Sequence, residues 1–198
     1  MVTTQQTNQR PRSEAQVIAF LAAMGALMAF GIDSSLPAFD EIRPAFGMAS
    51  DDTRVTLIIT TYFAGISLGH VIYGPLADRF GRAPTLRFGL LLYIIGSLAS
   101  MSANSFTFLL GGRLVWGFGA AAASVLRTTI ARDLYRGDQM ARIISITMAF
   151  FLLGPIVAPL IGEGLINAGS WRWPFGVSAI LAVGMMFWSY RFGETLDP

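Results

Sequence analysis

Long apolar runs without a charged residue constrain this chain more than any other feature of its sequence. Of the 198 residues, 54% are hydrophobic and only 13% are charged, which is too apolar for an ordinary soluble domain. An apolar run of about 18 residues or more is a candidate membrane span, because roughly 20 residues at 1.5 Å rise cross the ~30 Å hydrocarbon core. Such runs occur at Ala15–Ile32, Val55–Ala77, Phe88–Gly112, Ile143–Gly162 and Trp173–Tyr190.

A sixth run, Phe106–Leu126, overlaps the third and carries a single charge, Arg113. The polar segment SMSANSF supplies a turn, so the third helix is expected to end near Ser102 and the fourth to begin near Phe106. The sequence therefore predicts an all-α integral membrane bundle of six helices over residues 15–192. The expected helices are 15–39, 54–77, 84–102, 106–128, 140–163 and 172–191, between a tail at 1–14 and a linker beginning at 193–198.

The arginines predict the orientation of these spans, because cytoplasmic connections are enriched in basic residues. Arg43, Arg54 and Arg172 are the only arginines in the connections expected outside, which puts both termini in the cytoplasm. The first run follows basic residues, as a signal peptide does, but five further spans favour a retained helix. The arginines expected inside are Arg10, Arg12, Arg79, Arg82, Arg87, Arg127, Arg132, Arg136, Arg142 and Arg191.

The composition excludes several kinds of chemistry. The chain has no cysteine and one histidine, which excludes disulfides, thiolate chemistry and a metal cluster with several histidines. All of its basic residues are arginine, which excludes a lysine Schiff base and a P-loop. The arginines do not cluster on a polar domain, so nucleic acid is not expected as a partner. No cofactor or metal is expected, and no spacing typical of an intramembrane enzyme is present.

Two charged residues fall inside the predicted spans. Asp33 precedes Phe39, where the first helix should emerge, by six residues, which places it roughly 9 Å inside the outer face. Arg113 follows Phe106 by seven residues, at roughly 10 Å. The alternatives are an interfacial acid before Pro37 and an arginine that reaches the interface. We favour a water-filled cavity that both side chains face, in which Asp33 exchanges a proton and a cationic ligand can replace that proton.

Other polar and aromatic residues within the spans are weaker candidates. His70 is expected to form a hydrogen bond between helices rather than to act as a titrating relay. Tyr62, His70 and Trp116 are candidates for lining the cavity, although aromatic residues in membrane helices more often pack or face lipid. Glu163 is expected at the outer interface without a functional role.

Glycine and proline mark two helices as closely packed or bent. The segment GPIVAPLIG contains Gly154, Pro155, Pro159 and Gly162. Each proline removes a backbone hydrogen bond, so the fifth helix should bend, and the glycines should permit close approach of a neighbour. The small residues at Gly117–Ser124 predict a smooth packing face on the fourth helix.

The segment GPLADRFGRAP at 74–84 lies between the second and third spans and resembles the cytoplasmic signature of major facilitator superfamily transporters. The segment RLVWGFGAA in the predicted fourth helix is similar to that superfamily's fourth-helix pattern. It retains Arg113 and Gly117, and Trp116 stands at a position where glutamine is common. The segment GPIVAPLIG resembles the glycine-proline signature of its antiporter members. The residues that fit the cytoplasmic signature are Gly74, Leu76, Ala77, Asp78, Arg79, Gly81 and Arg82.

Three further segments narrow the resemblance to the Bcr/CflA-like drug:proton antiporters: IDSSLPAF at 32–39, RTTIARDLYRGDQMARIIS at 127–145, and ETL at 194–196. The resemblance implies the N-terminal half of a twelve-helix carrier, built from 3+3 inverted repeats, in a bacterial-type inner membrane. It further implies proton-coupled efflux of small amphipathic drugs, with Asp33 and Arg113 handling proton and drug. A C-terminal six-helix half, or self-association, would complete the cavity.

The resemblance also implies a cytoplasmic gate. Asp78 is expected to meet a helix N-terminus of the other half, or Arg127 or Arg132 below the fourth helix. His70 stands where glutamine is usual and Glu163 replaces a glycine, which leaves the substrate set open. The sequence is also compatible with two other functions: a nutrient symporter or uniporter of the same superfamily, and a non-transporting membrane scaffold or assembly partner.

Overall fold

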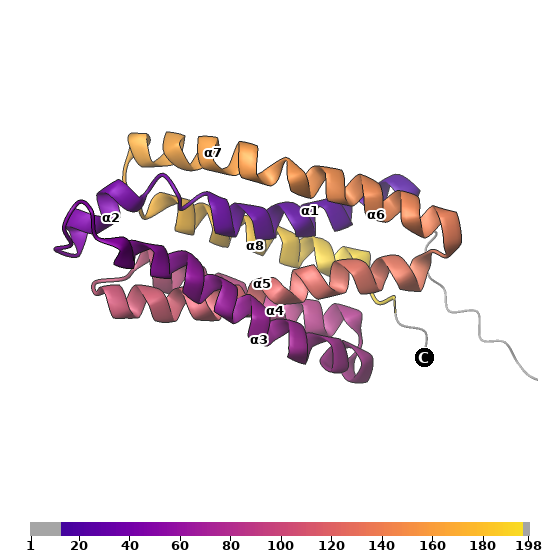
Figure 1. Cartoon of the computed structure of the whole chain (residues 1–198). Coiled ribbons are helices and arrows are strands. Elements are labelled where there is room, and N and C mark those ends of the chain that lie inside the picture. Colours follow the sequence, from indigo (N-terminus) through magenta and orange to yellow (C-terminus); the bar gives the residue numbers. More distant parts are fainter. Residues whose placement is uncertain (1–12, 196–198) are drawn as a thin grey trace, which may run out of the picture.

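The computed structural model describes residues 13–195, so the predictions for Arg10, Arg12 and the two chain ends beyond this range lie outside the described residues. In the described part, helices lie side by side along one direction (Figure 1). They are α1 (Glu14–Asp33), α2 (Phe39–Ala45), the 3₁₀ turn η1 (Thr53–Thr56), α3 (Leu57–Phe80), α4 (Arg82–Met101), α5 (Phe106–Leu134), α6 (Gly137–Leu152), α7 (Gly154–Ala168) and α8 (Trp173–Phe192).

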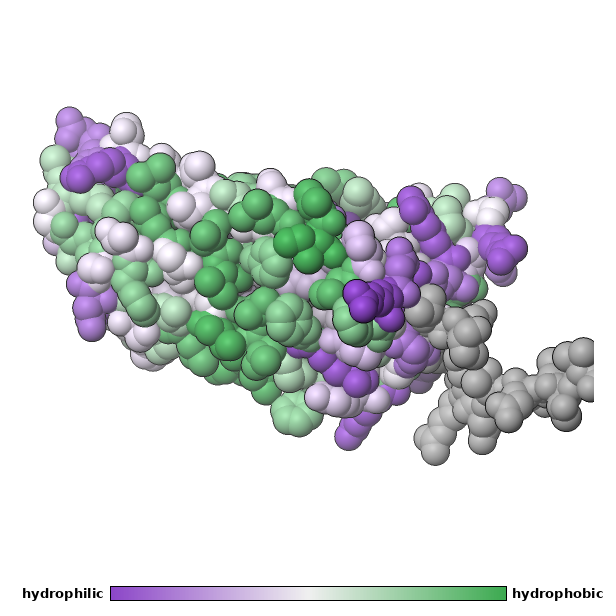
Figure 2. All heavy atoms as spheres, turned by 90° about the horizontal axis from the view of Figure 1, so that it is seen from below, coloured by the Kyte–Doolittle hydropathy of each residue, from purple (hydrophilic) through white to green (hydrophobic). Residues whose placement is uncertain are grey.

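Within residues 13–195, six stretches are long and apolar enough to cross a membrane, which confirms the predicted number of spans. Two of them join neighbouring elements: η1 continues into α3, and α6 continues into α7. On the face shown in Figure 2, apolar residues form a central band and polar residues gather towards both ends. This distribution fits a bundle whose middle lies in hydrocarbon and whose ends lie in the interfaces.

The observed helix ends differ from the predicted ones at two informative places. The first helix was expected to run to residue 39, but α1 ends at Asp33, and tight turns lead into the short α2. Pro37 explains the break, because it has no N–H to continue the helical hydrogen bonds. The fourth helix was expected to end near 128, but α5 continues to Leu134, so Arg127 and Arg132 lie on it rather than below it.

The helix packing has the symmetry of two three-helix repeats. In the first packing group α5 lies between α3 and α4, and in the second α1 packs against α6, α7 and α8. Exchanging the first three spans with the last three converts one group into the other. The same exchange swaps α1 with α5 and α4 with α8, so the α1–α5 contact and the α4–α8 contact each remain the same contact. This is the arrangement that the predicted 3+3 repeat requires.

Small residues allow α5 to lie very close to its neighbours. A Cβ atom at Gly117 would collide with the backbone of Tyr62 on α3, and one at Gly119 with the backbone of Tyr93 on α4. The side chains of the alanines at 120–123 are buried. The smooth face predicted at Gly117–Ser124 is therefore confirmed as a packing surface.

The fifth span is interrupted at Leu153, between α6 and α7. Pro155 lies in the first turn of α7, where its missing N–H costs least, and Pro159 lies inside α7. A Cβ at Gly154 would meet Ala29, and one at Gly162 would meet the Ser34 carbonyl. The predicted bend is therefore a break in the helix, and both glycines permit close contact with α1 as predicted.

Candidate functional site

Arg113 is the most deeply enclosed charge in the described part of the chain, with no solvent exposure. Its guanidinium donates three hydrogen bonds: Nη1 to the Gly31 carbonyl at 2.9 Å, Nε to the Ile58 carbonyl at 3.1 Å, and Nη2 to Ser35 Oγ at 3.3 Å. Gly31 lies in the last turn of α1, where carbonyls lack helical partners. Arg113 thus joins α5 to the end of α1 and the start of α3.

Aromatic rings complete the surroundings of Arg113. Its guanidinium carbon lies 4.6 Å from the ring centre of Tyr62 and 4.7 Å from that of Trp116, distances at which a cation is attracted to a ring face. Trp116 in turn meets Tyr62, Tyr93 and Phe175 edge-on. The aromatic cluster therefore shields the charge from the bilayer and ties four spans together.

Asp33 is the last residue of α1 and is half-buried. It lies two residues from each of the α1-end groups that bind Arg113, Gly31 and Ser35, yet it makes no ion pair with Arg113 among the described residues. No hydrogen bond to its carboxylate is present in the described part of the chain either. A half-buried carboxylate in this state can take up a proton without first breaking an existing contact.

The predicted common cavity for Asp33 and Arg113 is wrong for Arg113, which faces the packed interior. The reason is the early end of α1, which frees the Gly31 carbonyl and turns Ser35 towards the guanidinium. Tyr62 and Trp116, proposed as cavity-lining residues, are likewise fully buried. The Tyr62 hydroxyl has no hydrogen-bond partner in the described structure.

His70 lies apart from this cluster. Its Nε2 lies 3.2 Å from Ser124 Oγ on α5, and its Nδ1 lies 2.9 Å from the Ile66 carbonyl one turn earlier on α3. The hydrogen bond between helices that the sequence analysis favoured is therefore present. Within residues 13–195 no group of three histidine or acidic side chains is arranged to hold a metal ion.

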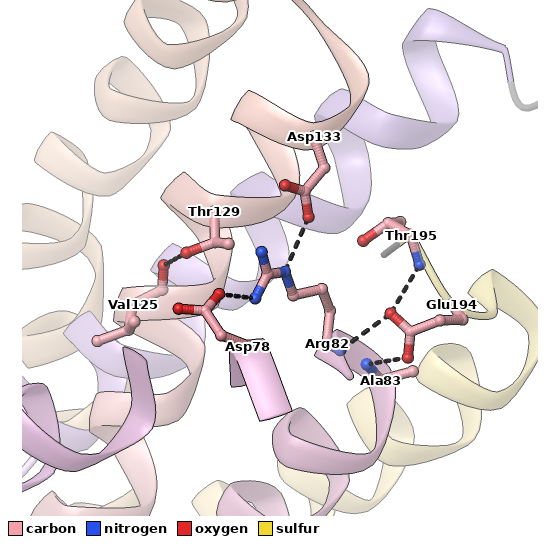
Figure 3. Close-up of polar contacts among 8 residues, drawn as sticks. All are labelled: Asp78, Arg82, Ala83, Val125, Thr129, Asp133, Glu194 and Thr195. Atoms are coloured by element: carbon pink, nitrogen blue, oxygen red, sulfur yellow. Dashed lines mark hydrogen bonds and ion pairs between the residues drawn. The ribbon is translucent and has the colours of Figure 1, made fainter. Parts of the chain in front are cut away.

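A second polar cluster lies at the opposite end of the bundle, around Arg82 (Figure 3). Arg82 is buried, and its Nη1 donates to Asp78 Oδ1 at 2.5 Å while its Nε donates to Asp133 Oδ2 at 2.9 Å. These partners come from the end of α3 and from the last turn of α5. One arginine thus links three helices that belong to both repeats.

Glu194 completes this cluster from the segment after α8. Its Oε1 accepts from the backbone N–H of Arg82 at 2.9 Å, and its Oε2 accepts from that of Ala83 at 3.0 Å (Figure 3). These N–H groups open α4, where helical partners are lacking and a negative charge is favoured. Gly81 makes the approach possible, because a Cβ there would lie 2.6 Å from Glu194 Oε2.

The structure contradicts the predicted pairing of Asp78 with Arg127 or Arg132, whereas its predicted contact with a helix N-terminus of the other half stays a prediction. Asp78 pairs with Arg82, and neither Arg127 nor Arg132 contacts it among the described residues. Arg127 lies half-buried between α5, α1 and α6, with its Nη1 against Gly25 and its guanidinium 5.3 Å from the Phe151 ring centre. The physical reason is again helix length, because α5 ends at Leu134, six residues beyond the predicted end at 128.

Of the other signature residues, Gly74 and Arg79 lie on α3, which continues to Phe80. A Cβ at Gly74 would meet nothing, and Arg79 stacks on Phe80 with its guanidinium carbon 5.3 Å from the ring centre. Neither residue joins the Arg82 cluster. Sequence reasoning missed Asp133 and Glu194, although both fall in the segments 127–145 and 194–196 that carried the narrower resemblance. For Glu194, an acid just after a helix was the available signal, because such a group can reach a neighbouring helix start.

Comparisons with known proteins agree with this architecture. A family model described as Major Facilitator Superfamily matches residues 19–197. The chain is 32% identical over 170 residues to a bicyclomycin resistance protein homolog of Haemophilus influenzae, covering 84% of this chain and 42% of that protein. It is also 32% identical over 175 residues to a chloramphenicol resistance protein of Pseudomonas aeruginosa, covering 88% and 41%. The similarity to multidrug resistance protein D of Escherichia coli is 29% over 144 residues, covering 73% and 36%.

The chain spans less than half the length of these relatives. Among solved structures, a proton:xylose symporter, XylE, bound to 6-bromo-6-deoxy-D-glucose matches with a TM-score of 0.82 at 15% identity, covering 91% of this chain and 45% of that one. At this identity the match shows the fold alone. With the six spans and the family match over most of its length, the chain is a multi-pass membrane protein that belongs to the Major Facilitator Superfamily.

Proposed function

We propose that this chain forms half of a carrier that exports small amphipathic compounds across a bacterial-type cytoplasmic membrane in exchange for protons. A second six-helix unit would provide the other wall of the transport path. The names of the similar resistance proteins support the choice of efflux and of drug-like substrates.

The observation that carries the proposal is the state of Asp33. Its carboxylate is half-buried at the end of α1, and no described side chain neutralises it. Burial favours the protonated form of a carboxyl group, whereas contact with water or a cationic ligand favours the ionised form. A change in exposure of the α1 end during transport would therefore change how strongly Asp33 holds its proton.

Arg113 has a positioning role in this proposal. It holds the end of α1 through the Gly31 carbonyl and Ser35, so the location of Asp33 depends on it. The guanidinium also provides a fixed positive charge that opposes protonation of a nearby carboxyl group. Movement of α1 relative to α5 would change that influence, which couples proton binding to helix motion.

The Arg82 cluster would act as the cytoplasmic gate. The Asp78 side chain is 72% exposed, and only its Oδ1 is used by Arg82. Its second oxygen can therefore meet the positive end of a helix in the other half, a contact worth about 0.3–1 kcal/mol and up to ~2 kcal/mol when partly buried. Such a contact is strong enough to bias an opening equilibrium and weak enough to be released in each cycle.

The test is transport by the complete gene product in liposomes that contain a pH-sensitive dye. With an imposed pH gradient, addition of chloramphenicol should cause substrate movement together with proton movement in the opposite direction. Xylose in place of chloramphenicol is the control for a nutrient symporter. Co-directional movement of xylose and protons would favour the symporter, and no movement of either compound would favour a scaffold.

A further inference from the structure

An open groove runs over α1 between α7 and α8, on a face that neither the Arg113 cluster nor the Arg82 cluster uses. Its volume is about 550 Å³, and its lining consists of small and apolar residues. Its lining comes from α1, which contributes three alanines together with Leu27 and Phe30, and from α6, α7 and α8. The residues that define it best are Ala22, Ala26, Val157, Leu181, Gly184 and Trp188.

A second hollow continues this groove towards the end of α8. The two hollows share Gly184 and Trp188, and the second includes Gln16, Tyr190 and Arg191. The groove is therefore apolar at one end and polar and basic at the other. No acidic side chain of the described chain forms an ion pair with Arg191, whose side chain is exposed.

The length and depth of the groove match one leaflet of a bilayer. Leu181 lies near the middle of α8 and Arg191 near its end, ten residues later. At 1.5 Å per residue this separation is about 15 Å, which is half of the ~30 Å hydrocarbon core. Trp188 and Tyr190 lie close to the basic end, where aromatic residues typically mark the membrane interface.

We propose that the groove is a binding site for one phospholipid with an anionic headgroup. One acyl chain would lie over the α1 alanines, and the phosphate-containing headgroup would meet Arg191. An open apolar groove inside the bilayer must be filled by apolar groups, because close contacts between atoms are what stabilise an apolar surface. A flexible acyl chain fits such a shape, and the single unpaired arginine at its mouth selects for negative charge.

This site does not rest on the proposed transport function. It requires only that the chain spans a membrane. The end of α8 lies beside the start of α4, as the Glu194 contacts show, so the bound lipid belongs to the leaflet on the side of the Arg82 cluster. If that side is cytoplasmic, the lipid comes from the leaflet in which anionic lipids are concentrated.

The groove can be filled from within without disturbing the fold. A Cβ at Gly184 would meet no atom within 4 Å, so Gly184→Leu places its side chain in the open groove. Gly164 on α7 is equally open but is not part of the groove, which makes Gly164→Leu the matched control. Arg191→Gln removes the charge at the mouth, and Arg132→Gln removes another exposed charge at the same end of the bundle.

The experiment is native mass spectrometry of the purified chain in detergent with added dioleoyl phosphatidylglycerol or dioleoyl phosphatidylcholine. The wild-type chain and Gly164→Leu should each retain one phosphatidylglycerol, and Gly184→Leu should lose it. Arg191→Gln should reduce the preference for phosphatidylglycerol over phosphatidylcholine by about fivefold, the effect of one basic residue near a membrane surface. Arg132→Gln should leave the preference unchanged.

Three results would overturn the proposal. The first is equal retention of both lipids by the wild-type chain, which would show a nonspecific annulus. The second is wild-type retention of phosphatidylglycerol by Gly184→Leu, which would place the lipid elsewhere. The third is a wild-type dimer without bound lipid together with a monomeric Gly184→Leu variant, which would show that a second copy of the chain occupies the groove. Arg191→Gln changes an exposed side chain without a described partner, so its result remains interpretable if Gly184→Leu fails to fold.

Discussion

Arg113 is held in the membrane interior by backbone carbonyls rather than by a carboxylate. An isolated charge at the centre of a bilayer costs roughly 2.5–3.5 kcal/mol even on insertion-based scales. Here the cost is offset by the Gly31 and Ile58 carbonyls, by Ser35, and by the faces of Tyr62 and Trp116. The negative end of the α1 helix dipole thus takes the place of a carboxylate counterion.

Replacement of Arg113 should therefore destabilise the fold. Arg113→Met leaves the buried Gly31 carbonyl without a donor, whereas the Ile58 carbonyl still accepts from Thr61 Oγ1 and the Ser35 hydroxyl still donates to the Ile32 carbonyl. At about 1–3 kcal/mol for one unsatisfied buried group, the free energy of unfolding should fall by about that amount. Arg113→Lys should lower the free energy of unfolding less, because lysine keeps the positive charge. Some loss should remain, because lysine lacks the planar guanidinium that donates to several acceptors at once.

Reversible unfolding in mixed micelles measures this loss. Arg132→Met is the control, since Arg132 is exposed and has no described partner. Its effect should stay within about 0.5 kcal/mol. Equal effects of the Arg113 and Arg132 substitutions would show that the buried hydrogen bonds do not matter for stability.

The sequence was sufficient to predict that Arg113 lies at the depth of Asp33, but not which groups bind it. A first helix running to residue 39 would have placed the Gly31 carbonyl inside the helix, where the N–H of Ser35 would occupy it. The end of α1 at Asp33 frees that carbonyl. The error in the site thus followed from an error of a few residues in a helix boundary, which is the part of a sequence prediction that depends most on tertiary contacts.

At the scale of the helix, the start of α4 depends on a residue over one hundred positions away in the chain. Gly81 has φ +96° and ψ 160°, a conformation that only glycine adopts readily, and it leaves space for Glu194 to bind the first N–H groups of α4. The sequence places Gly81 in the cytoplasmic signature between the second and third spans. It could not predict the Glu194 contact, because no local pattern brings the end of α8 to the start of α4.

The two residues should therefore be coupled. Gly81→Ala forces a strained backbone, at about 1–3 kcal/mol, and also displaces the Glu194 cap, at about 0.5–2 kcal/mol. In a Glu194→Ala background the second cost is already present, so the two losses should be less than additive by about 1 kcal/mol. Unfolding free energies of both single variants and the double variant measure this coupling, with Glu163→Ala as an exposed acid control. Strict additivity would mean that Gly81 acts through its backbone conformation alone.

Two neighbouring glycines of α7 should respond in opposite directions to the same substitution. A Cβ at Gly162 collides with the Ser34 carbonyl, so Gly162→Ala should destabilise by about 1–3 kcal/mol. Gly164 is open, so Gly164→Ala should stabilise the helix by up to ~1 kcal/mol. Thermal unfolding of both variants in detergent tests the α1–α7 contact, and a gain in stability for Gly162→Ala would show that the helices are not held this closely.

For the whole molecule, hydrophobic runs alone predicted the number of spans, because a helix in lipid must satisfy its own backbone hydrogen bonds. The short α2 and the break at Leu153 were harder to predict, since both lie where the backbone departs from regular helix through proline. The proposed orientation rests on the distribution of arginines between the two ends of the bundle.

Single cysteines test that orientation, because the chain contains none of its own. Asp51→Cys lies in the connection between α2 and η1, and Arg132→Cys lies near the end of α5 at the opposite end of the bundle. In intact cells a membrane-impermeant maleimide should label Asp51→Cys, whereas Arg132→Cys should react only after permeabilisation. The reverse pattern would place the Arg82 cluster outside the cytoplasm and remove its proposed role as an inner gate.

The proposed exchange of protons for substrate depends on Asp33. The decisive measurement compares wild type with Asp33→Asn in liposomes that contain the complete gene product, using labelled chloramphenicol. Asp33→Asn should abolish accumulation driven by a pH gradient while preserving counterflow exchange of labelled for unlabelled substrate, because the side chain keeps its size but cannot release a proton. Asp51→Asn, in an exposed connection, should behave as wild type in both assays. Gradient-driven accumulation by Asp33→Asn at the wild-type rate would show that Asp33 does not carry the exchanged proton.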